Sequence, residues 1–204
     1  LEITSPILEI PDVNSYNLYF GWYLGELDQN DDFFDTYHAK YPDRCIGFSE
    51  HGADANPAYQ SAHPEKGDYT ETYQCVYHEH MAKMIADRPW LWATHVWNMF
   101  DFGSGNRHEG DVGQTNTKGI VTFGRDVKKD VFFFYKANWS QAPVTYIVER
   151  RHTNRVLREA KEAGEQRQEQ SEGREERRGK TESEGVGSSR RLRSKEKDSD
   201  SNSP

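Results

Sequence analysis

The sequence predicts an α/β fold made of consecutive strand–helix units, and three observations lead to this class. Short apolar runs bounded by turn-forming residues recur along the chain, as at residues 45–49 and 91–98. A segment with apolar residues at helical spacing lies between these two runs. Glu50 stands at the end of the first run, where barrel and open α/β folds place their chemistry. Alternation of this kind is typical of parallel strands with crossover helices.

The first quarter of the chain already shows this alternation. Residues 1–11 are apolar with two prolines and predict an edge or lead-in segment, and residues 14–19 predict a strand. A short helix is expected to begin at residues 31–38, because its first turn is acidic and Pro42 follows its end. Residues 45–49 predict the next strand, which delivers Glu50 into a turn of small residues.

A long loop and the best-marked helix follow this strand. Residues 53–67 are rich in Pro, Asn, Ser and Gly and predict a loop, and residues 68–71 have the spacing of a capping box. Pro89 ends the helix that begins there. Its predicted buried face consists of aromatic, aliphatic and histidine side chains: Tyr73, Val76, Tyr77, His80, Met81 and Met84.

The remaining elements are shorter. Residues 91–98 predict an aromatic strand, and residues 104–114 predict a glycine-rich polar loop. Residues 120–123 predict a short strand and residues 129–139 a last helix.

Composition separates a folded body from a tail. The chain has 204 residues, 34% of them hydrophobic, and a formal net charge of −8. Residues 156–204 hold 12 basic and 12 acidic residues, so the body at residues 1–155 carries the whole excess of negative charge. We expect this tail to be disordered, because it has almost nothing to bury. An acidic body is a poor partner for phosphate backbones, which argues against nucleic-acid binding.

Two features bear on the redox state and the location of the chain. Cys45 falls in a predicted strand and Cys75 in a predicted helix, which favours two buried free thiols over a disulfide. No run is long and apolar enough to cross a membrane, and no signal-like segment opens the chain. We therefore expect a cytoplasmic location and no membrane partner.

Four segments of the chain resemble motifs of one enzyme family and follow one another in the same order as in that family. Residues 48–54 read Phe-Ser-Glu-His-Gly-Ala-Asp and resemble the S-E-Y-G-A segment of glycoside hydrolase family 2, the β-galactosidases and β-glucuronidases. Residues 17–23 resemble that family's N-x-Y-Y-G-W-Y, and residues 96–102 resemble its W-N-x-x-D-F. Residues 116–123 and the following Lys-Lys-Asp continue the family's order. The resemblance extends from about residue 10 to residue 155.

The resemblance implies a fold and a reaction. It makes the body the last βα units of a (β/α)8 TIM barrel, because three strands are too few to close the eight-stranded barrel of this family. It makes Glu50 the nucleophile of a retaining glycosidase, which forms a covalent glycosyl-enzyme. The family's acid/base glutamate follows an asparagine, and this sequence contains no Asn-Glu pair. We therefore expect the chain to be an incomplete glycoside hydrolase that is inactive by itself.

The resemblance also implies a set of substrate-binding residues. Asn17, Tyr19 and Tyr23 lie at the end of the strand before Glu50, where the family uses a tyrosine to hydrogen-bond and orient the nucleophile. Packing of aromatic side chains at the end of the barrel is the alternative. Trp97 ends the last strand and would present its indole face to a sugar ring, with a core role as the alternative.

Residues Asn116 and Lys118 form an N-x-K pair, which in β-glucuronidases grips the carboxylate of the sugar. Galactosidase-like members share this pair, and residues 73–80 and 107–111 look more like the galactosidase branch. We therefore expect hydrolysis of a terminal β-galactoside. A β-glucuronidase-type glycosidase and a non-catalytic sugar-binding remnant are the alternatives.

The one histidine-rich segment of the sequence does not predict a metal site. His78, Glu79 and His80 lack the His-Glu-x-x-His spacing of a zinc helix, because Ala82 stands four residues after His78. We assign them surface or packing roles and expect no metal site and no cofactor in this chain. The resemblance allows Mg or Na ions, and oligomerisation, in a full-length member of the family.

Overall fold

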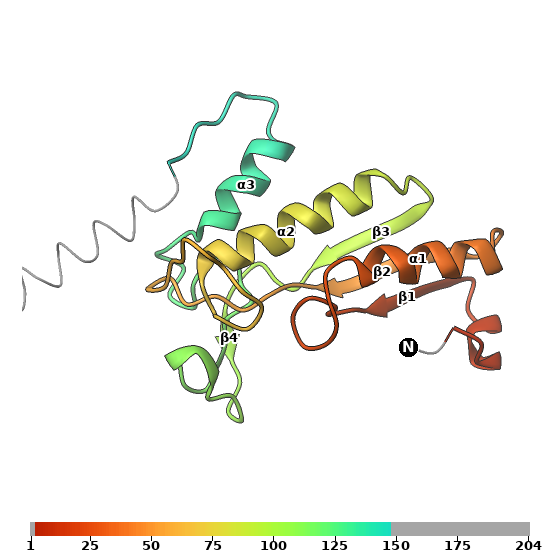
Figure 1. Cartoon of the computed structure of the whole chain (residues 1–204), viewed down its shortest axis with the longest axis horizontal. Helices are drawn as coiled ribbons and strands as arrows, with labels where there is room; N and C mark the ends of the chain where they lie inside the picture. Colours follow the sequence, from red (N-terminus) through yellow and green to blue (C-terminus); the bar gives the residue numbers. More distant parts are fainter. Residues whose placement is uncertain (1–2, 148–204) are drawn as a thin grey trace, which may run out of the picture. The chain divides into compact units, whose positions relative to one another are not determined.

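The computed structural model describes residues 3–147, and Figure 1 shows their elements in chain order. The strands are β1 (Val13–Asn17), β2 (Cys45–His51), β3 (Leu91–Val96), β4 (Phe102–Gly103) and β5 (Thr115–Asn116). The helices are α1 (Gln29–Lys40), α2 (Glu71–Ala86) and α3 (Asp130–Trp139), with 3-10 turns η1 (Pro6–Glu9) and η2 (Glu109–Asp111). The tail predicted at residues 156–204 lies outside the described residues, and so does the end of the predicted body.

The main sheet of the described part is parallel, with β2 between β1 and β3. Val13 of β1 pairs with Cys45 of β2, and Ile46 of β2 pairs with Leu91 of β3. Because the helices α1 and α2 connect these parallel strands, the predicted α/β class and its strand–helix units are confirmed. A closed barrel is not seen: within residues 3–147, β1 and β3 are the edges of an open sheet.

Two predicted strands differ from the structure. Strand β1 ends at Asn17, because Trp22 and Tyr23 both donate their backbone N–H groups to the carbonyl of Tyr19 at 3.0 Å and close a turn there. Residues 120–123 form no strand: Val121 makes only isolated bridges, to Phe100 and to Lys128. The hairpin of β4 and β5, which encloses the polar loop, was not predicted.

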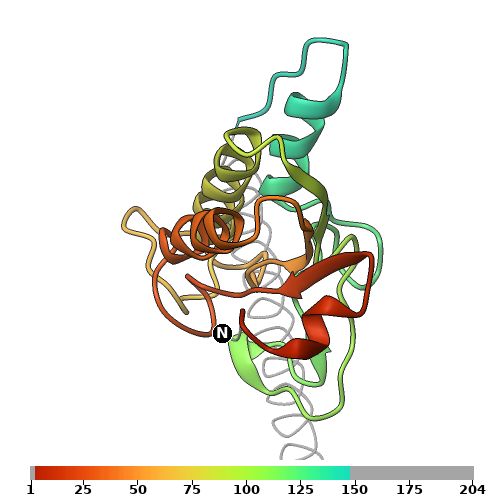
Figure 2. The ribbon, with the colours of Figure 1, turned by 90° about the vertical axis from the view of Figure 1, so that its right-hand side faces the viewer.

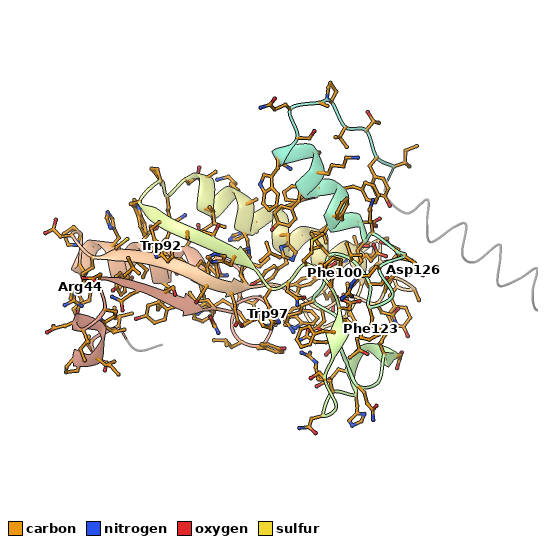
Figure 3. The ribbon with its side chains drawn as sticks, turned by 180° about the vertical axis from the view of Figure 1, so that it is seen from behind. Arg44, Trp92, Trp97, Phe100, Phe123 and Asp126 are labelled. Carbon is orange, nitrogen blue, oxygen red and sulfur yellow. The ribbon has the colours of Figure 1, made fainter. Side chains whose placement is uncertain are left out.

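Helices α1 and α2 cover the same face of the sheet, as Figures 1 and 2 show from two directions. Apolar side chains of both helices and of β2 form the core between them. Its buried members are Leu18, Trp22, Phe34, Tyr37, Ile46, Phe48, Ala53, Tyr73, Tyr77, Met81 and Met84. The opposite face is the one seen in Figure 3, where Trp92 lies across the sheet. The indole Nε1–H of Trp92 donates to the carbonyl oxygen of Asn14 at 3.3 Å. A Cβ added to Gly47 would lie only 2.4 Å from this Nε1 atom, so the indole packs where a larger residue than glycine would clash.

The start of α2 differs in detail from the predicted capping box. Thr70 is the N-cap, and its side-chain oxygen accepts the backbone N–H of Tyr73 at 2.9 Å. Asp68 instead accepts the backbone N–H of Thr70 at 2.8 Å. The carboxylate of Glu71 is drawn into the interior, where it accepts the backbone N–H of Asp130 at the start of α3, at 2.6 Å. The cap of one helix and the beginning of another are therefore linked.

The buried face of α2 also differs from the predicted one. Val76 is 39% exposed, whereas His78 is buried and its Nδ1 lies 2.9 Å from the hydroxyl of Tyr135 on α3. His80 faces α1 instead, with its Nε2 2.8 Å from Asp31. The two histidines therefore serve different interfaces, and the packing role predicted for them holds.

A second apolar cluster joins α3 to α2. It contains the buried residues Ile120, Val121, Val131 and Tyr135. Cys75 of α2 packs against this cluster, and both Cys45 and Cys75 are free thiols, half-buried rather than fully buried. Among the described residues, no helix combines the length and the apolar character needed to span a membrane.

We predict that acid destabilises this fold through its buried histidines. Burial lowers the pKa of His51 to about 3 and lowers the pKa of His78 well below its ordinary value. Between pH 6.5 and 3 the unfolded chain therefore binds protons that the folded chain does not, and stability falls as the pH falls. From pH 7 to pH 5 each such histidine should cost roughly 2 kcal/mol of unfolding free energy.

Urea unfolding at a series of pH values measures this slope. Replacing His51 by Asn should flatten the pH dependence, because a group that titrates only in the unfolded state is removed. Replacing the exposed His63 by Asn is the matched control and should leave the slope of the wild type in place. A wild-type stability that does not change between pH 7 and pH 5 would contradict the prediction.

Candidate active site

Glu50 and Tyr19 meet at the carboxyl end of the parallel sheet. Glu50 is the penultimate residue of β2, and Tyr19 follows the end of β1. The backbone N–H of Leu18 donates to the carbonyl of Glu50 at 3.0 Å, which holds the two strand ends together. The hydroxyl of Tyr19 donates to Glu50 Oε2 at 2.8 Å. Burial and the neighbouring Glu50 carboxylate raise the pKa of Tyr19, so this phenol keeps its proton and stays a donor.

Asn17 is the last residue of β1 and Trp97 directly follows β3, the two strands that flank β2. Asn17 pairs with Glu50 in the strand register, and its Oδ1 accepts the hydroxyl of Ser49 at 2.8 Å. Trp97 follows β3, where its backbone N–H donates to the carbonyl of His51 at 2.8 Å (Figure 3). The Trp97 ring is half-buried and packs edge-on against Phe102, with the ring centroids 5.7 Å apart. Both residues lie at the carboxyl end of the sheet, as Glu50 does, and their contact with a sugar stays a prediction.

A fully buried carboxylate, that of Asp54, lies four residues after Glu50 and collects hydrogen bonds from several segments. Its Oδ1 accepts both the backbone N–H and the hydroxyl of Thr117, each at 3.0 Å. Its Oδ2 accepts the indole N–H of Trp22 at 2.8 Å and Arg107 Nη2 at 2.9 Å. The ammonium of Lys118 also donates to Oδ2.

The charge of Asp54 is compensated by these partners. Burial by itself raises the pKa of a carboxyl, but the ammonium of Lys118 and the guanidinium of Arg107 oppose it, and the pKa of Asp54 falls below its ordinary value. Asp54 therefore stays ionised in the interior. With two cations on one carboxylate, the three side chains carry a net positive charge next to Tyr23.

Both residues of the N-x-K pair are buried, and their contact with a sugar stays a prediction. Asn116 is buried, and its Oδ1 accepts the backbone N–H of Lys118 at 3.1 Å, which fixes the turn. The Lys118 side chain is only 1% exposed and donates to Asp54 and to the hydroxyl of Tyr23. In this structure Lys118 is thus turned inward, and Tyr23, 56% exposed, is the member of the group that meets solvent.

Another buried ion pair supports the loops behind the site. The ammonium of Lys129 donates to Asp101 Oδ1 at 2.9 Å and to the carbonyls of Ala55 at 2.8 Å and Thr117 at 2.6 Å. Burial lowers the pKa of Lys129 and raises that of Asp101, against the attraction between the two charges. Lys129 therefore ties together the segments that follow β2, β3 and β5.

The arrangement suits nucleophilic chemistry on a polar ligand. Glu50 is a carboxylate held by a phenol donor, and the ring of Tyr23 lies beside the ring of Tyr19 with centroids 5.1 Å apart. The cationic Lys118 and Arg107 lie behind Tyr23. One end of the site thus offers an anionic nucleophile and the other a positively polarised donor.

Sequence reasoning missed Asp54, Arg107 and Lys129 as parts of the site. The sequence gives one indication that Asp54 is buried and paired: it is a charged residue among small residues directly after a buried strand, and a buried charge needs a partner. The sequence gives no such indication for Arg107, because charged residues are common in a polar loop. Arg107 and Asp54 are also far apart in the sequence, so local patterns do not predict their contact.

Comparison with curated proteins shows that the chain is similar to a β-glucuronidase of Bacteroides fragilis. It is 44% identical over 143 residues, which cover 67% of this chain and 21% of that protein. The chain thus spans about a fifth of the length of that relative. No protein-family model matches the chain.

Solved structures give the same relationship. An FMN-binding β-glucuronidase from Faecalibacterium prausnitzii L2-6 matches with a TM-score of 0.72 and 48% identity, over 74% of this chain and 24% of that one. A Bacteroides fragilis protein provisionally named a β-galactosidase matches with a TM-score of 0.65 and 38% identity, over 69% and 22%. Bacteroides uniformis β-glucuronidase 2, covalently bound to cyclophellitol-6-carboxylate aziridine, matches with a TM-score of 0.68 and 34% identity, over 72% and 17%.

We predict that Asp54 is required for folding as well as for the site. Asp54→Asn keeps the size of the side chain but leaves the buried ammonium of Lys118 and the half-buried guanidinium of Arg107 without this counter-charge. Breaking a buried pair in this way typically costs about 3–5 kcal/mol. Urea unfolding monitored by tryptophan fluorescence measures this loss.

The matched control is Asp87→Asn, which removes the exposed ion pair of Asp87 with Lys83. It should change stability little, because solvent screens exposed pairs. If the two variants lost equal stability, Asp54 would not have the structural role assigned to it.

Proposed function

Because this chain is a partial relative of glycoside hydrolase family 2, the family of β-glucuronidases and β-galactosidases, we propose that it is the nucleophile-bearing part of a retaining β-glucuronidase. The observation that carries this proposal is the contact of Tyr19 with Glu50 at the carboxyl end of the sheet. Glu50 attacks the anomeric carbon of a β-glucuronide and forms a glycosyl ester, while the glycosidic carbon–oxygen bond breaks and the aglycone leaves as an alcohol protonated by a general acid. Water then hydrolyses the ester and releases the sugar and Glu50. Tyr19 orients the attacking oxygen.

The choice of glucuronide over galactoside revises the expectation from sequence. The curated relative and two of the three solved structures described above are named β-glucuronidases, and one of them carries an inhibitor with a carboxylate. The ammonium of Lys118 and the guanidinium of Arg107, which both donate to the Tyr23 hydroxyl, favour a sugar with a carboxylate over a neutral one. A galactoside is the second candidate, supported by the relative that is provisionally named a β-galactosidase.

We predict covalent labelling of Glu50 by cyclophellitol-6-carboxylate aziridine. Attack of a carboxylate oxygen of Glu50 on one aziridine carbon forms an ester and breaks the bond between that carbon and the nitrogen. The nitrogen takes up a proton and stays attached to the neighbouring carbon as an amine, so the whole inhibitor is added to the protein. Mass spectrometry of proteolytic peptides should locate the added mass on Glu50. Glu50→Gln should remain unlabelled, and replacing the exposed Glu79 by Gln should leave labelling intact.

Two matched probes decide the sugar. The neutral cyclophellitol aziridine and its galacto-configured form should label more slowly than the carboxylate form. Faster labelling by the galacto-configured probe would favour the galactoside. No labelling by any of the three would support a sugar-binding remnant without catalysis.

We also predict that the chain by itself does not turn over a nitrophenyl glucuronide above background. No Asn-Glu pair is present to supply the acid that protonates the leaving oxygen, and general acid help is typically worth about 10²–10⁴-fold in rate. The rate of nitrophenol release by the purified chain tests this. Turnover that disappears in Glu50→Gln would show that another carboxyl serves as the acid.

A further inference from the structure

A pocket of about 430 Å³ lies between α2, α3 and the segment that follows α3, which Figure 1 shows turning back beside that helix. This volume is within the range of small-molecule sites in proteins. The pocket shares no lining residue with the candidate active site. Most of its walls are aromatic or aliphatic side chains from all three segments: Val76, Phe133, Phe134, Ala137, Val144 and Tyr146. A ligand with an apolar body therefore suits it.

Tyr146 fixes the wall that the segment after α3 provides. Its ring stacks on the ring of Phe133, with the centroids 3.8 Å apart and an angle of 5° between the planes. Its hydroxyl donates to Asp130 Oδ1 at 2.7 Å, and Gln60 Nε2 donates to the other oxygen of this carboxylate at 2.8 Å. Stacking and hydrogen bonding thus hold the wall in place without a ligand.

The thiol of Cys75 also lines the pocket. Burial raises the pKa of this thiol, and the carboxylates of Asp130 and Glu79 raise it further, so the thiol keeps its proton. A protonated thiol behaves as a small apolar group. The pocket therefore offers no nucleophile, and a ligand is held there without a covalent bond.

Both charged residues of the lining are acids, Glu79 of α2 and Asp130 of α3. Glu79 is exposed, so its charge lies where the pocket meets solvent, and within residues 3–147 it makes no hydrogen bond or ion pair. The ammonium of Lys83, one turn further along α2, binds Asp87 at 2.7 Å instead. A carboxylate beside aromatic rings favours a cation, because the ring faces attract positive charge as well.

We propose that this pocket is a binding site for a small organic cation, a primary ammonium carried on an aryl or short alkyl group. The apolar body lies against Val76, Phe134 and Val144, and the ammonium pairs with Glu79 at the solvent side. The proposal goes beyond the proposed function and does not depend on it, because the pocket uses none of the residues of the glycosidase site.

Three probes of nearly equal shape and different charge test this: 4-phenylbutylammonium, the neutral 4-phenylbutanol and the anionic 4-phenylbutyrate. Two-dimensional NMR titration of the full chain measures their dissociation constants and locates the site by the amide signals that move. The cation should bind about fivefold more tightly than the alcohol, the gain of one partly exposed ion pair, and the anion more weakly than both. The signals that move should be those around Cys75 and Phe134.

Three variants complete the test. Glu79→Gln should bring the affinity for the cation within about twofold of that for the alcohol and leave the alcohol unchanged, since only the ion pair is lost. Glu9→Gln removes the same charge from an exposed ion pair with Arg44 and should change no constant. Ala137→Trp puts an indole into the pocket from an exposed position and should remove the binding of all three probes. If that variant has no thermal unfolding transition, Val76→Trp takes its place.

A preference for the cation that is lost in Glu79→Gln supports the proposal, and one that survives in this variant overturns it. Equal affinity for the three probes also overturns it, because the pocket would then bind apolar groups without selecting a charge. Movement of amide signals only outside α2 and α3, or no saturable binding, would show that the pocket does not take this class of ligand. None of these results bears on the proposed function, which the labelling of Glu50 tests separately.

Discussion

The buried carboxylate of Asp54 is the interaction on which the carboxyl end of this sheet depends. Three other segments of the chain donate hydrogen bonds to its two oxygens: Trp22 after β1, Arg107 in the polar loop, and Thr117 and Lys118 after β5. Asp54 itself follows β2. A carboxylate removed from water is stable only if it is paired and hydrogen-bonded, so its burial requires all these segments to be in place. One charge thus joins loops that come from distant parts of the chain.

The two tyrosines of the site owe their different surroundings to this organisation. Tyr19 donates to an anion, Glu50, and Tyr23 accepts from two cations, Arg107 and Lys118, although their rings lie side by side. The same side-chain type therefore donates to a carboxylate in one position and accepts from two cations in the other. The partner of each oxygen, and not the residue type, decides what the phenol does.

Different interactions stabilise different parts of the described chain. Behind the sheet, α1 and α2 bury an apolar core, whereas at the carboxyl end the buried pairs of Asp54 with Lys118 and of Asp101 with Lys129 hold the loops. Strands of two residues, such as β4 and β5, suffice there because ionic contacts fix the loops that they border. Polar groups are thereby kept near the site, where a polar ligand needs partners.

The sequence by itself determined the strand–helix order, the free thiols, the position of Glu50 at a strand end and the presence of a tyrosine beside it. These follow from local periodicity, from turn residues and from motifs in a fixed order, all of which act over short stretches of chain. Only the tertiary structure decided that Lys118 points inward, that β1 ends before Tyr19, and that Arg107 joins Asp54 and Tyr23. The pairing of Arg107 with Asp54 cannot be inferred from the residues around either of them, because the two lie 53 positions apart in the sequence. Their contact depends on how the loops at the carboxyl end of the sheet meet in the folded chain.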